Sequence, residues 1–259
     1  MTPFAVHAQG WNGLAATQEF AALAERLDDW LARSPGTLVV RYDSRYVRRI
    51  DLPSGTVYLK HIRALTDAGL DGREWLSWCK WVFRPSRALA TWRISRRLLE
   101  AGFRCPEPLL AVRRRRRLYP TDVFISAAIP YPDLWQDASL PPAELARFLA
   151  AELARFHDAG FAHGDCILRN LCRDTAASRL VFLDNDRTWQ PPALLRRHYQ
   201  RRNLAQLAYS LLRRHDGQPE AARLFLEAYA ASPGAAPCNP QAILDQALRR
   251  LQKKHPPKA

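Results

Sequence analysis

The sequence predicts an α+β protein with two lobes, a small antiparallel sheet followed by a mainly helical part, on three observations. Short runs rich in β-branched and aromatic residues, separated by turn residues, occupy much of the first half of the chain. Long amphipathic runs with helical spacing occupy the second half. Between them, residues 130–142 contain four prolines and predict an extended joint. We therefore expect an N-terminal lobe over residues 1–130 and a C-terminal lobe over residues 131–259.

The N-terminal lobe is expected to begin with a helix at Thr17–Ala32, whose apolar residues recur at helical spacing before Ser34-Pro35-Gly36 ends it. Three strands should follow, the last two joined by a turn at Pro53-Ser54-Gly55: Thr37–Tyr42, Tyr46–Leu52 and Thr56–Lys60. Two helical stretches come next, at Arg73–Phe83 and Pro85–Ala101. The lobe closes with a predicted hairpin, in which a run of arginines forms the turn: Leu109–Val112, Arg113–Arg117 and Leu118–Ala128.

The C-terminal lobe should open with a strongly amphipathic helix at Pro142–Gly160. The loop Phe161–Asn170 follows, and a short apolar strand is predicted at Leu180–Leu183. From Leu194 onward the pattern is helical, most clearly in two stretches that precede a Pro/Gly break at 232–240: Asn203–Arg214 and Glu220–Ala231.

The chain is strongly basic, with 39 Lys and Arg against 25 Asp and Glu and a net charge of +14. Such a surface attracts phosphate groups on nucleic acid, anionic lipid or a phosphorylated substrate. Frequent use of arginine as an ordinary solvated cation accounts for the same count. Because the sequence has no helix-turn-helix signature, zinc-ligand set or aromatic RNA-binding motif, we do not expect nucleic acid as a partner.

Five cysteines, an odd number without CxxC spacing, favour reduced thiols over disulfides or a zinc site. No secretory signal opens the chain, and no window approaches the ~18 apolar residues of a membrane span. These features predict a cytoplasmic protein that is soluble or peripheral to a membrane.

The chemistry is expected in His163-Gly164-Asp165, with Asn170 five residues after Asp165 and Asp184 at the end of an apolar run. Phosphoryl transfer needs a carboxylate near the attacking hydroxyl and metal ions that neutralise the phosphates. Asp165 suits the first task. Asn170 and Asp184 offer the oxygen ligands that Mg²⁺ prefers. His163 is counted with the catalytic residues, although ordering the loop by hydrogen bonds is its more frequent role.

The segments HGDCILRN and VFLDNDR resemble the lipopolysaccharide-core kinases, a family that phosphorylates Kdo or heptose and is distantly related to protein kinases. RYDSRYVRRIDLPSGTVYLKHIR is similar to the first three strands of that family, SRALATWRISRRLLEAGFRCPEPL to its next helix and NLAQLAYSLL to a later one. The resemblance runs from about Leu38 to Leu212. It implies a bilobal protein-kinase-like fold and ATP and Mg²⁺ as cofactors.

The resemblance also implies a role for each matching residue. Asp165 would be the base, Asn170 and Asp184 the magnesium ligands, and Lys60 the partner of the α- and β-phosphates of ATP. The acceptor would be a hydroxyl of a lipopolysaccharide-core glycolipid or another anionic sugar.

Three departures from the family pattern stand out. Asp43-Ser44-Arg45, between the first two strands, contains no glycine to cover the phosphates, so Ser44 or Arg45 would contact them instead. Thr91 stands where the family commonly has the Glu that pairs with the lysine, and Glu74 or Glu100 are substitutes. The metal motif reads Asp184-Asn185-Asp186, which the family tolerates.

These departures leave two alternatives to the sugar kinase open. The chain could be a catalytically dead kinase fold that serves as a scaffold, since no Glu is assured for Lys60. It could also be a small-molecule phosphotransferase of the aminoglycoside or choline type, which shares the H-G-D-x-x-x-x-N loop. The abundant arginine favours an anionic acceptor over the cationic substrates of that class.

Two segments hint at membrane or substrate contact. Glu74–Phe83 places tryptophans along one helical stripe among cations, which suits either an anionic membrane surface or packing on the small lobe. Arg113–Arg117 could hold phosphates or be a solvated hairpin tip.

Overall fold

The computed structural model describes residues 2–42, 44–63, 85–116 and 119–254. It divides into two compact units, one formed by Met1–Arg97 with Pro106–Ile129 and the other by Leu98–Cys105 with Pro130–Ala259.

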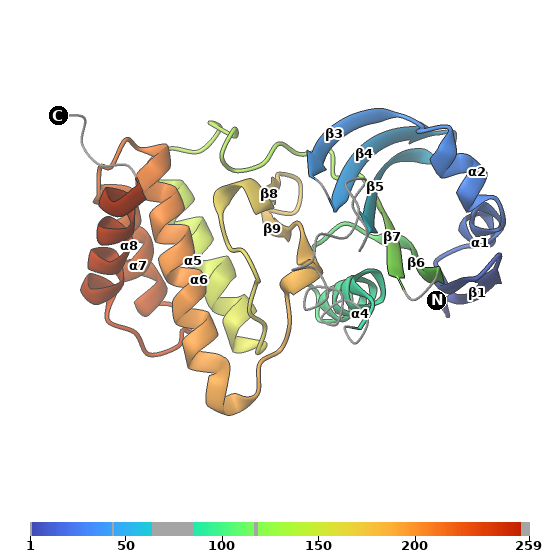
Figure 1. Cartoon of the computed structure of the whole chain (residues 1–259). Coiled ribbons are helices and arrows are strands. Elements are labelled where there is room, and N and C mark those ends of the chain that lie inside the picture. The colour runs from blue at the N-terminus through green and yellow to red at the C-terminus, as the bar shows by residue number, and fades with distance from the viewer. Residues whose placement is uncertain (1, 43, 64–84, 117–118, 255–259) are drawn as a thin grey trace, which may run out of the picture. The chain divides into compact units, whose positions relative to one another are not determined.

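The first unit is built on a seven-stranded antiparallel sheet with the order β1-β2-β6-β7-β5-β4-β3 (Figure 1). In chain order the strands are β1 (Phe4–Ala8), β2 (Trp11–Ala15), β3 (Thr37–Tyr42), β4 (Arg45–Leu52), β5 (Gly55–Arg63), β6 (Pro108–Arg116) and β7 (Tyr119–Ala127). The predicted strands β3, β4 and β5 are present, and Leu52 pairs with Gly55 across the expected turn. β5 lies between β7 and β4, so its register is fixed by pairing on both sides.

The hairpin of β1 and β2 was not predicted from the sequence. Its turn is Gln9-Gly10, and both residues have positive φ, at 49° and 79°. Such a turn matches the right-handed twist of the flanking strands. Each strand has only five residues and carries few β-branched side chains, so the sequence signal for strands is weak here.

The sheet buries one face against two short helices, α1 (Gln18–Glu25) and α2 (Leu27–Ala32). The predicted helix at Thr17–Ala32 is therefore broken at Arg26, while Thr17 caps its start by accepting a hydrogen bond from Phe20 N. The core on this face gathers apolar residues from α1, α2 and most strands, among them Trp11, Phe20, Leu27, Leu59, Leu110 and Ile125.

The opposite face packs on helix α4 (Arg87–Glu100), close to the predicted Pro85–Ala101. Ala88 and Trp92 of α4 contact Ala111 of β6, with Phe124 of β7 beside them. Asp122 accepts hydrogen bonds from Ser86 Oγ at 2.8 Å and from Arg87 N at 2.9 Å, so a strand side chain anchors the start of α4. The helix expected at Arg73–Phe83, and with it the tryptophan stripe, lies outside the described residues.

The sequence predicts the run Arg113–Arg117 as the turn of the β6–β7 hairpin, but its described part, residues 113–116, is not a turn, and Arg117 lies outside the described residues. Residues 113–116 belong to β6. Arg113 Nε lies 3.5 Å from Asp122 Oδ1, and Arg114 bonds Asp28 while its guanidinium carbon lies 4.4 Å from the ring centre of Trp11. Side chains alternate along a strand, so arginines that look like a polar tip in sequence find separate partners on the two faces.

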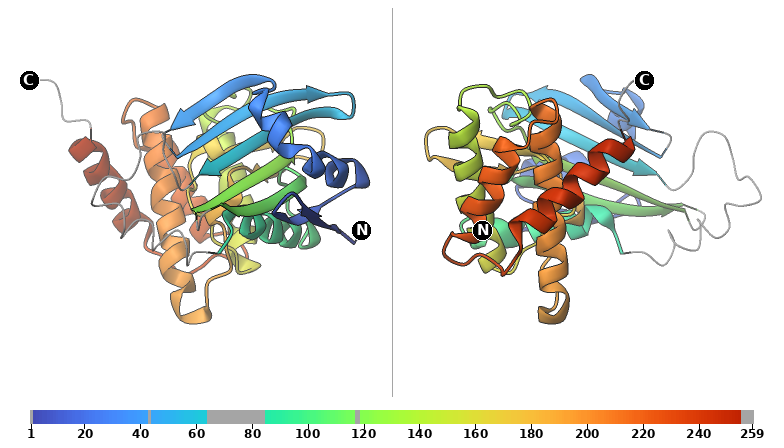
Figure 2. Two further views of the ribbon diagram at one scale, coloured as in Figure 1. Left: turned by 45° about the vertical axis from the view of Figure 1, so that its right-hand side comes forward. Right: turned by 90° about the vertical axis from the view of Figure 1, so that its left-hand side faces the viewer.

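The second unit contains helices α5 (Pro142–Asp158), α6 (Ala193–Arg214), α7 (Glu220–Ala230) and α8 (Pro240–Lys254), and the two-stranded hairpin of β8 (Leu171–Asp174) and β9 (Arg179–Phe182). Helix α6 packs against α7 and α8, and α5 against α7 (Figure 2). The predicted helices are present, whereas β8 was not predicted. No helix in the described part of the chain has the length and apolar character to cross a bilayer.

Aromatic side chains fill the core beneath the hairpin. Phe103 makes edge-to-face contacts with Phe156, Phe161 and Phe182, at centroid distances of 5.3–6.2 Å. Phe156 of α5 and Phe182 of β9 stack at 4.1 Å. Offset and edge-to-face packing of this kind adds about 0.5–1.5 kcal/mol per pair beyond the area that it buries. The hairpin is thereby fixed on α5.

Candidate active site

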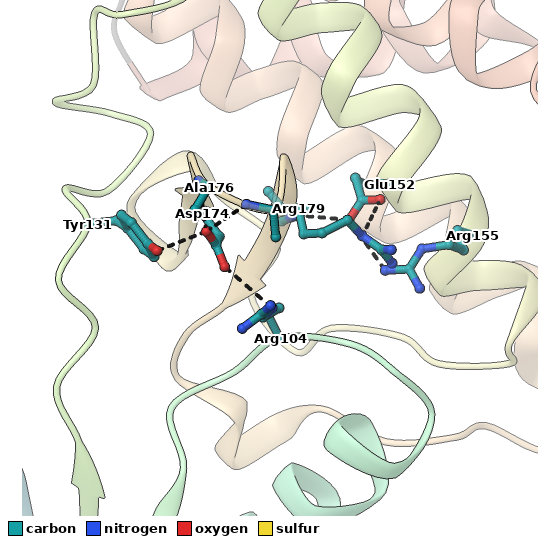
Figure 3. A network of polar contacts seen from close by, with 9 residues as sticks. Arg104, Tyr131, Glu152, Arg155, Asp174, Ala176 and Arg179 are labelled. Carbon is teal, nitrogen blue, oxygen red and sulfur yellow. Dashed lines mark hydrogen bonds and ion pairs between the residues drawn. The ribbon is translucent and has the colours of Figure 1, made fainter.

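Two carboxylates tie the β8–β9 hairpin to its surroundings (Figure 3). Asp174 accepts hydrogen bonds from Tyr131 Oη at 2.8 Å and from the Ala176 and Ala177 amides at 3.1 Å, and Arg104 Nε lies 3.4 Å away. These hydrogen bonds, first that from Ala177, hold the pKa of Asp174 below its usual value. Glu152 of α5 accepts from Leu180 N at 2.9 Å and pairs with two arginines, Arg155 and Arg179.

The hairpin brings the ends of two distant segments together. Leu171 pairs with Phe182, and Leu183 N donates to Asn170 O at 2.9 Å. Asn170, the last residue of the predicted catalytic loop, therefore lies beside the residue that precedes Asp184. The sequence predicts one site for the Asn170 and Asp184 side chains, and the strand register brings the backbones of these two segments together.

His163 holds the loop through both ring nitrogens. Nδ1 accepts a hydrogen bond from Asp165 N at 3.1 Å, so Nε2 carries the proton that is donated to Leu183 O at 2.8 Å. Burial lowers the pKa of His163, which keeps the ring neutral. A neutral ring with one acceptor and one donor is what this pair of contacts requires, and the imidazole thereby links the Asp165 backbone to the strand end before Asp184.

Three polar residues on the buried side of α6 bind the backbone of the loop. Asn203 accepts from His163 N at 2.9 Å and donates to His163 O at 2.6 Å. Gln206 Oε1 accepts from Cys166 N at 3.3 Å, and Ser210 Oγ accepts from Leu168 N at 3.1 Å. Buried backbone groups need such partners because an unsatisfied one costs about 1–3 kcal/mol. This role was not predicted from the sequence, although Asn, Gln and Ser at helical spacing among the apolar residues of the second half of α6 were the available signal.

A buried histidine extends this network into the helical core. His157 of α5 contacts Asn203 Oδ1 through Nε2 at 3.3 Å and Tyr229 Oη through Nδ1 at 2.7 Å. Burial lowers the pKa of His157 to about 4, so the ring is neutral at physiological pH. Asn203 thus contacts His157 in the helical core and binds the backbone of His163 in the loop.

Asp165 presents its carboxylate at an exposed position of the loop. Gln206 Nε2 lies 3.3 Å from Oδ1, and Asn170 Nδ2 lies 3.4 Å from Oδ2 and 2.9 Å from the Asp165 carbonyl oxygen. These neighbours donate to the carboxylate and to the backbone carbonyl of the same residue, so they restrain the Asp165 side chain from two sides. The arrangement gives the Asp165 carboxylate a fixed direction at an exposed position.

The two expected metal ligands have the oxygens that a magnesium ion needs. Asn170 turns its Nδ2 toward Asp165, which leaves Oδ1 available as a ligand. Asp184 has a left-handed backbone (φ 48°, ψ 54°), a conformation that is uncommon for residues other than glycine and that aspartate adopts more readily than most. No group of three or more His, Cys, Asp and Glu side chains of metal-site geometry occurs among the described residues. Two protein oxygens suffice, since Mg²⁺ usually retains water and nucleotide oxygens as its other ligands.

The neighbours of Asp184 and Asp165 have structural tasks. Asn185 is buried, donates to Phe182 O at 2.8 Å and accepts from Thr188 Oγ1 at 3.0 Å, which shapes the turn. Gly164 has no room for a side chain, because a Cβ there would lie 2.1 Å from Arg187 Cβ and 2.7 Å from Arg187 O. The loop and the turn after β9 therefore pack directly on each other.

The remaining expected site residues belong to the first unit. Lys60 lies on β5, in register with Val47 of β4 and Phe124 of β7. Arg45 shares that face of the sheet by register, and its guanidinium carbon lies 4.6 Å from the ring centre of Tyr42. Ser44 lies in the turn before β4, and its carbonyl oxygen accepts from Arg63 N.

The Glu partner of Lys60 stays an open prediction. Thr91 is buried and donates its hydroxyl to Arg87 O at 2.8 Å, within its own helix. Glu74 lies outside the described residues, and Glu100 ends α4.

The family follows from a comparison with protein-family models. Residues 76–229, more than half of the chain, match the lipopolysaccharide kinase (Kdo/WaaP) family. This chain belongs to that family. The match confirms the resemblance seen in the sequence, and membership makes the protein a kinase and thus a phosphotransferase. A search of curated protein sequences found no match.

Solved structures confirm the kinase-like fold, with an antiparallel sheet in the N-terminal region and helices in the C-terminal region. "WaaP in complex with acyl carrier protein" aligns with a TM-score of 0.60 and 18% identity, over 98% of this chain and 100% of that one. The Rio2 kinase from Chaetomium thermophilum, in an ADP/Mg²⁺-phosphoaspartate complex, aligns with a TM-score of 0.50 and 18% identity, over 98% of this chain and 82% of that one. At this identity the likeness supports the fold alone.

Proposed function

We propose that this Kdo/WaaP family kinase transfers the γ-phosphoryl group of ATP to a hydroxyl of the lipopolysaccharide inner core, on Kdo or heptose. The observation that carries the proposal is the loop from His163 to Asn170, in which a neutral histidine and α6 fix an exposed aspartate beside an asparagine that offers its side-chain oxygen. This is the arrangement that phosphoryl transfer requires, because the reaction depends on positioning and on charge neutralisation rather than on covalent help from the protein.

In this mechanism Asp165 orients the acceptor hydroxyl and takes its proton as the new O–P bond forms and the bond to ADP breaks. His163, Asn203 and Gln206 keep that carboxylate in place. Asn170 and Asp184 would hold magnesium, which neutralises charge on the phosphates when it is bound. Lys60 would contact the α- and β-phosphates, and Ser44 or Arg45 at the β3–β4 turn would cover them in place of a glycine-rich loop.

The acceptor class is supported by the family and by charge. The chain carries a net charge of +14, which favours an anionic glycolipid over the cationic substrates of aminoglycoside-type phosphotransferases. A lipid-anchored acceptor would bring the kinase to the cytoplasmic surface of the inner membrane. The WaaP structure with a similar fold contains acyl carrier protein, and co-purification with tagged acyl carrier protein tests whether this chain shares that partner.

The first test is Mg²⁺-dependent ATP binding, measured by thermal shift for the wild type and Asp184→Asn. At 100 times the dissociation constant, binding stabilises the folded state by about 2.7 kcal/mol. We expect a clear rise in melting temperature that needs both Mg²⁺ and ATP and that the variant loses. Absence of any rise at millimolar Mg·ATP would favour the scaffold alternative.

A further inference from the structure

A tryptophan outside the proposed chemistry is placed beside the catalytic loop by strand pairing. Leu134 N donates to Leu171 O at 2.7 Å, and Asp133 forms an antiparallel bridge with Cys172. Strand β8 begins at Leu171, directly after Asn170. The segment that carries Trp135 is therefore attached to the first residues that follow the loop.

The turn that displays Trp135 is held from two sides. The Asp133 carboxylate accepts hydrogen bonds from Trp135 N at 3.0 Å and from Gln136 N at 3.1 Å. On the other side, the Arg214 guanidinium of α6 donates to the carbonyl oxygens of Leu134 and Asp137. A half-buried aromatic ring on so constrained a turn has a fixed position relative to β8 and α6.

Two exposed arginines meet at this ring. The guanidinium carbon of Arg169 lies 5.1 Å from the ring centre of Trp135, and that of Arg213 lies 5.4 Å away. Contacts within about 6 Å are attractive because the ring face is electronegative. In the part of the chain that the structure describes, neither arginine has a carboxylate partner, and the nearby Asp133 carboxylate already accepts from backbone amides.

We propose that Arg169, Trp135 and Arg213, here called the Trp135 cluster, bind the anionic group of the acceptor. This inference rests on the proposed function and adds the site at which a carboxylate or phosphate of the acceptor is recognised. Guanidinium groups suit such oxyanions because their planar N–H forks form paired, charge-assisted hydrogen bonds. The indole keeps both forks ordered, which lowers the entropy lost on binding.

The sequence position of Arg169 connects the cluster to the reaction. It lies between Asp165 and Asn170 in the loop, immediately before the proposed metal ligand. An anion held there would set a neighbouring sugar hydroxyl near the Asp165 carboxylate. The cluster thus selects acceptors by charge and also orients them.

The test compares Arg213→Ala with Arg201→Ala, an exposed arginine on the same helix that is outside the cluster. Arg213 is preferred to Arg169 because it lies outside the catalytic loop. Two pairs of acceptors serve as probes in the presence of Mg²⁺ and a non-hydrolysable ATP analogue: a Kdo glycolipid with and without its carboxyl group reduced to an alcohol, and a heptose acceptor with and without its phosphate. The dissociation constant is measured by calorimetry.

A charge-assisted hydrogen bond gives about a ten- to hundredfold effect on affinity. We therefore expect Arg213→Ala to weaken one anionic acceptor at least about tenfold, while its neutral counterpart and the ATP analogue bind as to the wild type. A loss of affinity for the Kdo acceptor identifies the bound anion as its carboxylate, and a loss for the heptose acceptor identifies it as the phosphate. Arg213→Lys, which keeps the charge but not the fork, should recover part of the loss, and Arg201→Ala should have no effect.

Equal losses for charged and neutral acceptors, or no loss for either, would overturn the proposal. Inorganic phosphate separates this outcome from a failure of the proposed function. With the nucleotide site saturated by the Mg²⁺ complex of the analogue, phosphate should raise the melting temperature of the wild type and not that of Arg213→Ala. If it does so while no sugar is phosphorylated, the anion site stands and the proposed acceptor is wrong. If phosphate stabilises both proteins equally, the Trp135 cluster is not an anion site.

Discussion

Replacing Asn203 by alanine tests whether α6 positions the catalytic loop. The side chain is fully buried and binds both the N–H and the C=O of His163. The variant leaves two backbone groups without partners, at about 1–3 kcal/mol each, which predicts a loss of about 2–6 kcal/mol in the free energy of unfolding. Because His163 directs the Asp165 backbone, turnover should also fall, by about a hundredfold for a displacement of about 1 Å.

Urea unfolding and steady-state phosphotransfer measure the two effects on the same protein samples. Ser210→Ala removes the hydroxyl that accepts from Leu168 N and should cost about 1–3 kcal/mol, less than Asn203→Ala. Gln218→Ala, at an exposed site, is the control and should stay within about 0.5 kcal/mol of the wild type. A loss below about 1 kcal/mol with unchanged turnover for Asn203→Ala would refute the positioning role of α6.

Three further predictions address pH and packing. His157 has a folded pKa of about 4 against about 6.5 when unfolded, so protons favour the unfolded state and stability should fall by about 2 kcal/mol from pH 7.5 to pH 5. His157→Phe should lack that part of the slope in urea titrations, and an unchanged slope would exclude His157 as its source. Asp174, whose pKa is lowered, stabilises the fold at neutral pH. This contribution should disappear as the pH falls below the aspartate range near about 4, and Asp174→Asn should unfold with a shallower acid transition. Gly164→Ala would place Cβ 2.1 Å from Arg187 Cβ and should lower turnover at least about tenfold, whereas retained activity would show that the loop can shift.

The sequence predicted much of the fold because its signals are local. Turn residues bounded β3, β4 and β5, and helical spacing marked α5 and α7. The prediction failed where the decisive contact is distant in sequence. Arg113 was predicted in a hairpin turn, but it lies in β6, where it pairs with Asp122 of the next strand. The five-residue strand β1 depends on its pairing with β2 across the turn at Gln9-Gly10, which its own residues do not indicate.

The candidate site shows the same difference between local signals and contacts that are distant in sequence. His163, Asp165, Asn170 and Asp184 were singled out from the sequence because phosphoryl transfer restricts both residue types and spacing, and their chemical roles stay predictions. The hydrogen bonds from α6 to the loop backbone could not be predicted, since the role of a buried asparagine such as Asn203 is evident only when its partner is known. Trp135 gave no signal for the same reason. Its two arginines lie 34 and 78 positions further along the chain, at Arg169 and Arg213.

The most direct test of the central claim is transfer of radiolabelled γ-phosphate from ATP to a Kdo-terminated or heptose-terminated glycolipid. Wild type, Asp165→Asn and the control Gln218→Ala are compared in the presence of Mg²⁺. The mechanism predicts labelled glycolipid with the wild type and the control. It predicts none with Asp165→Asn, which should still bind Mg·ATP by thermal shift. Undiminished labelling by Asp165→Asn would contradict the role of Asp165, and no labelling by the wild type with either acceptor would contradict the proposed reaction.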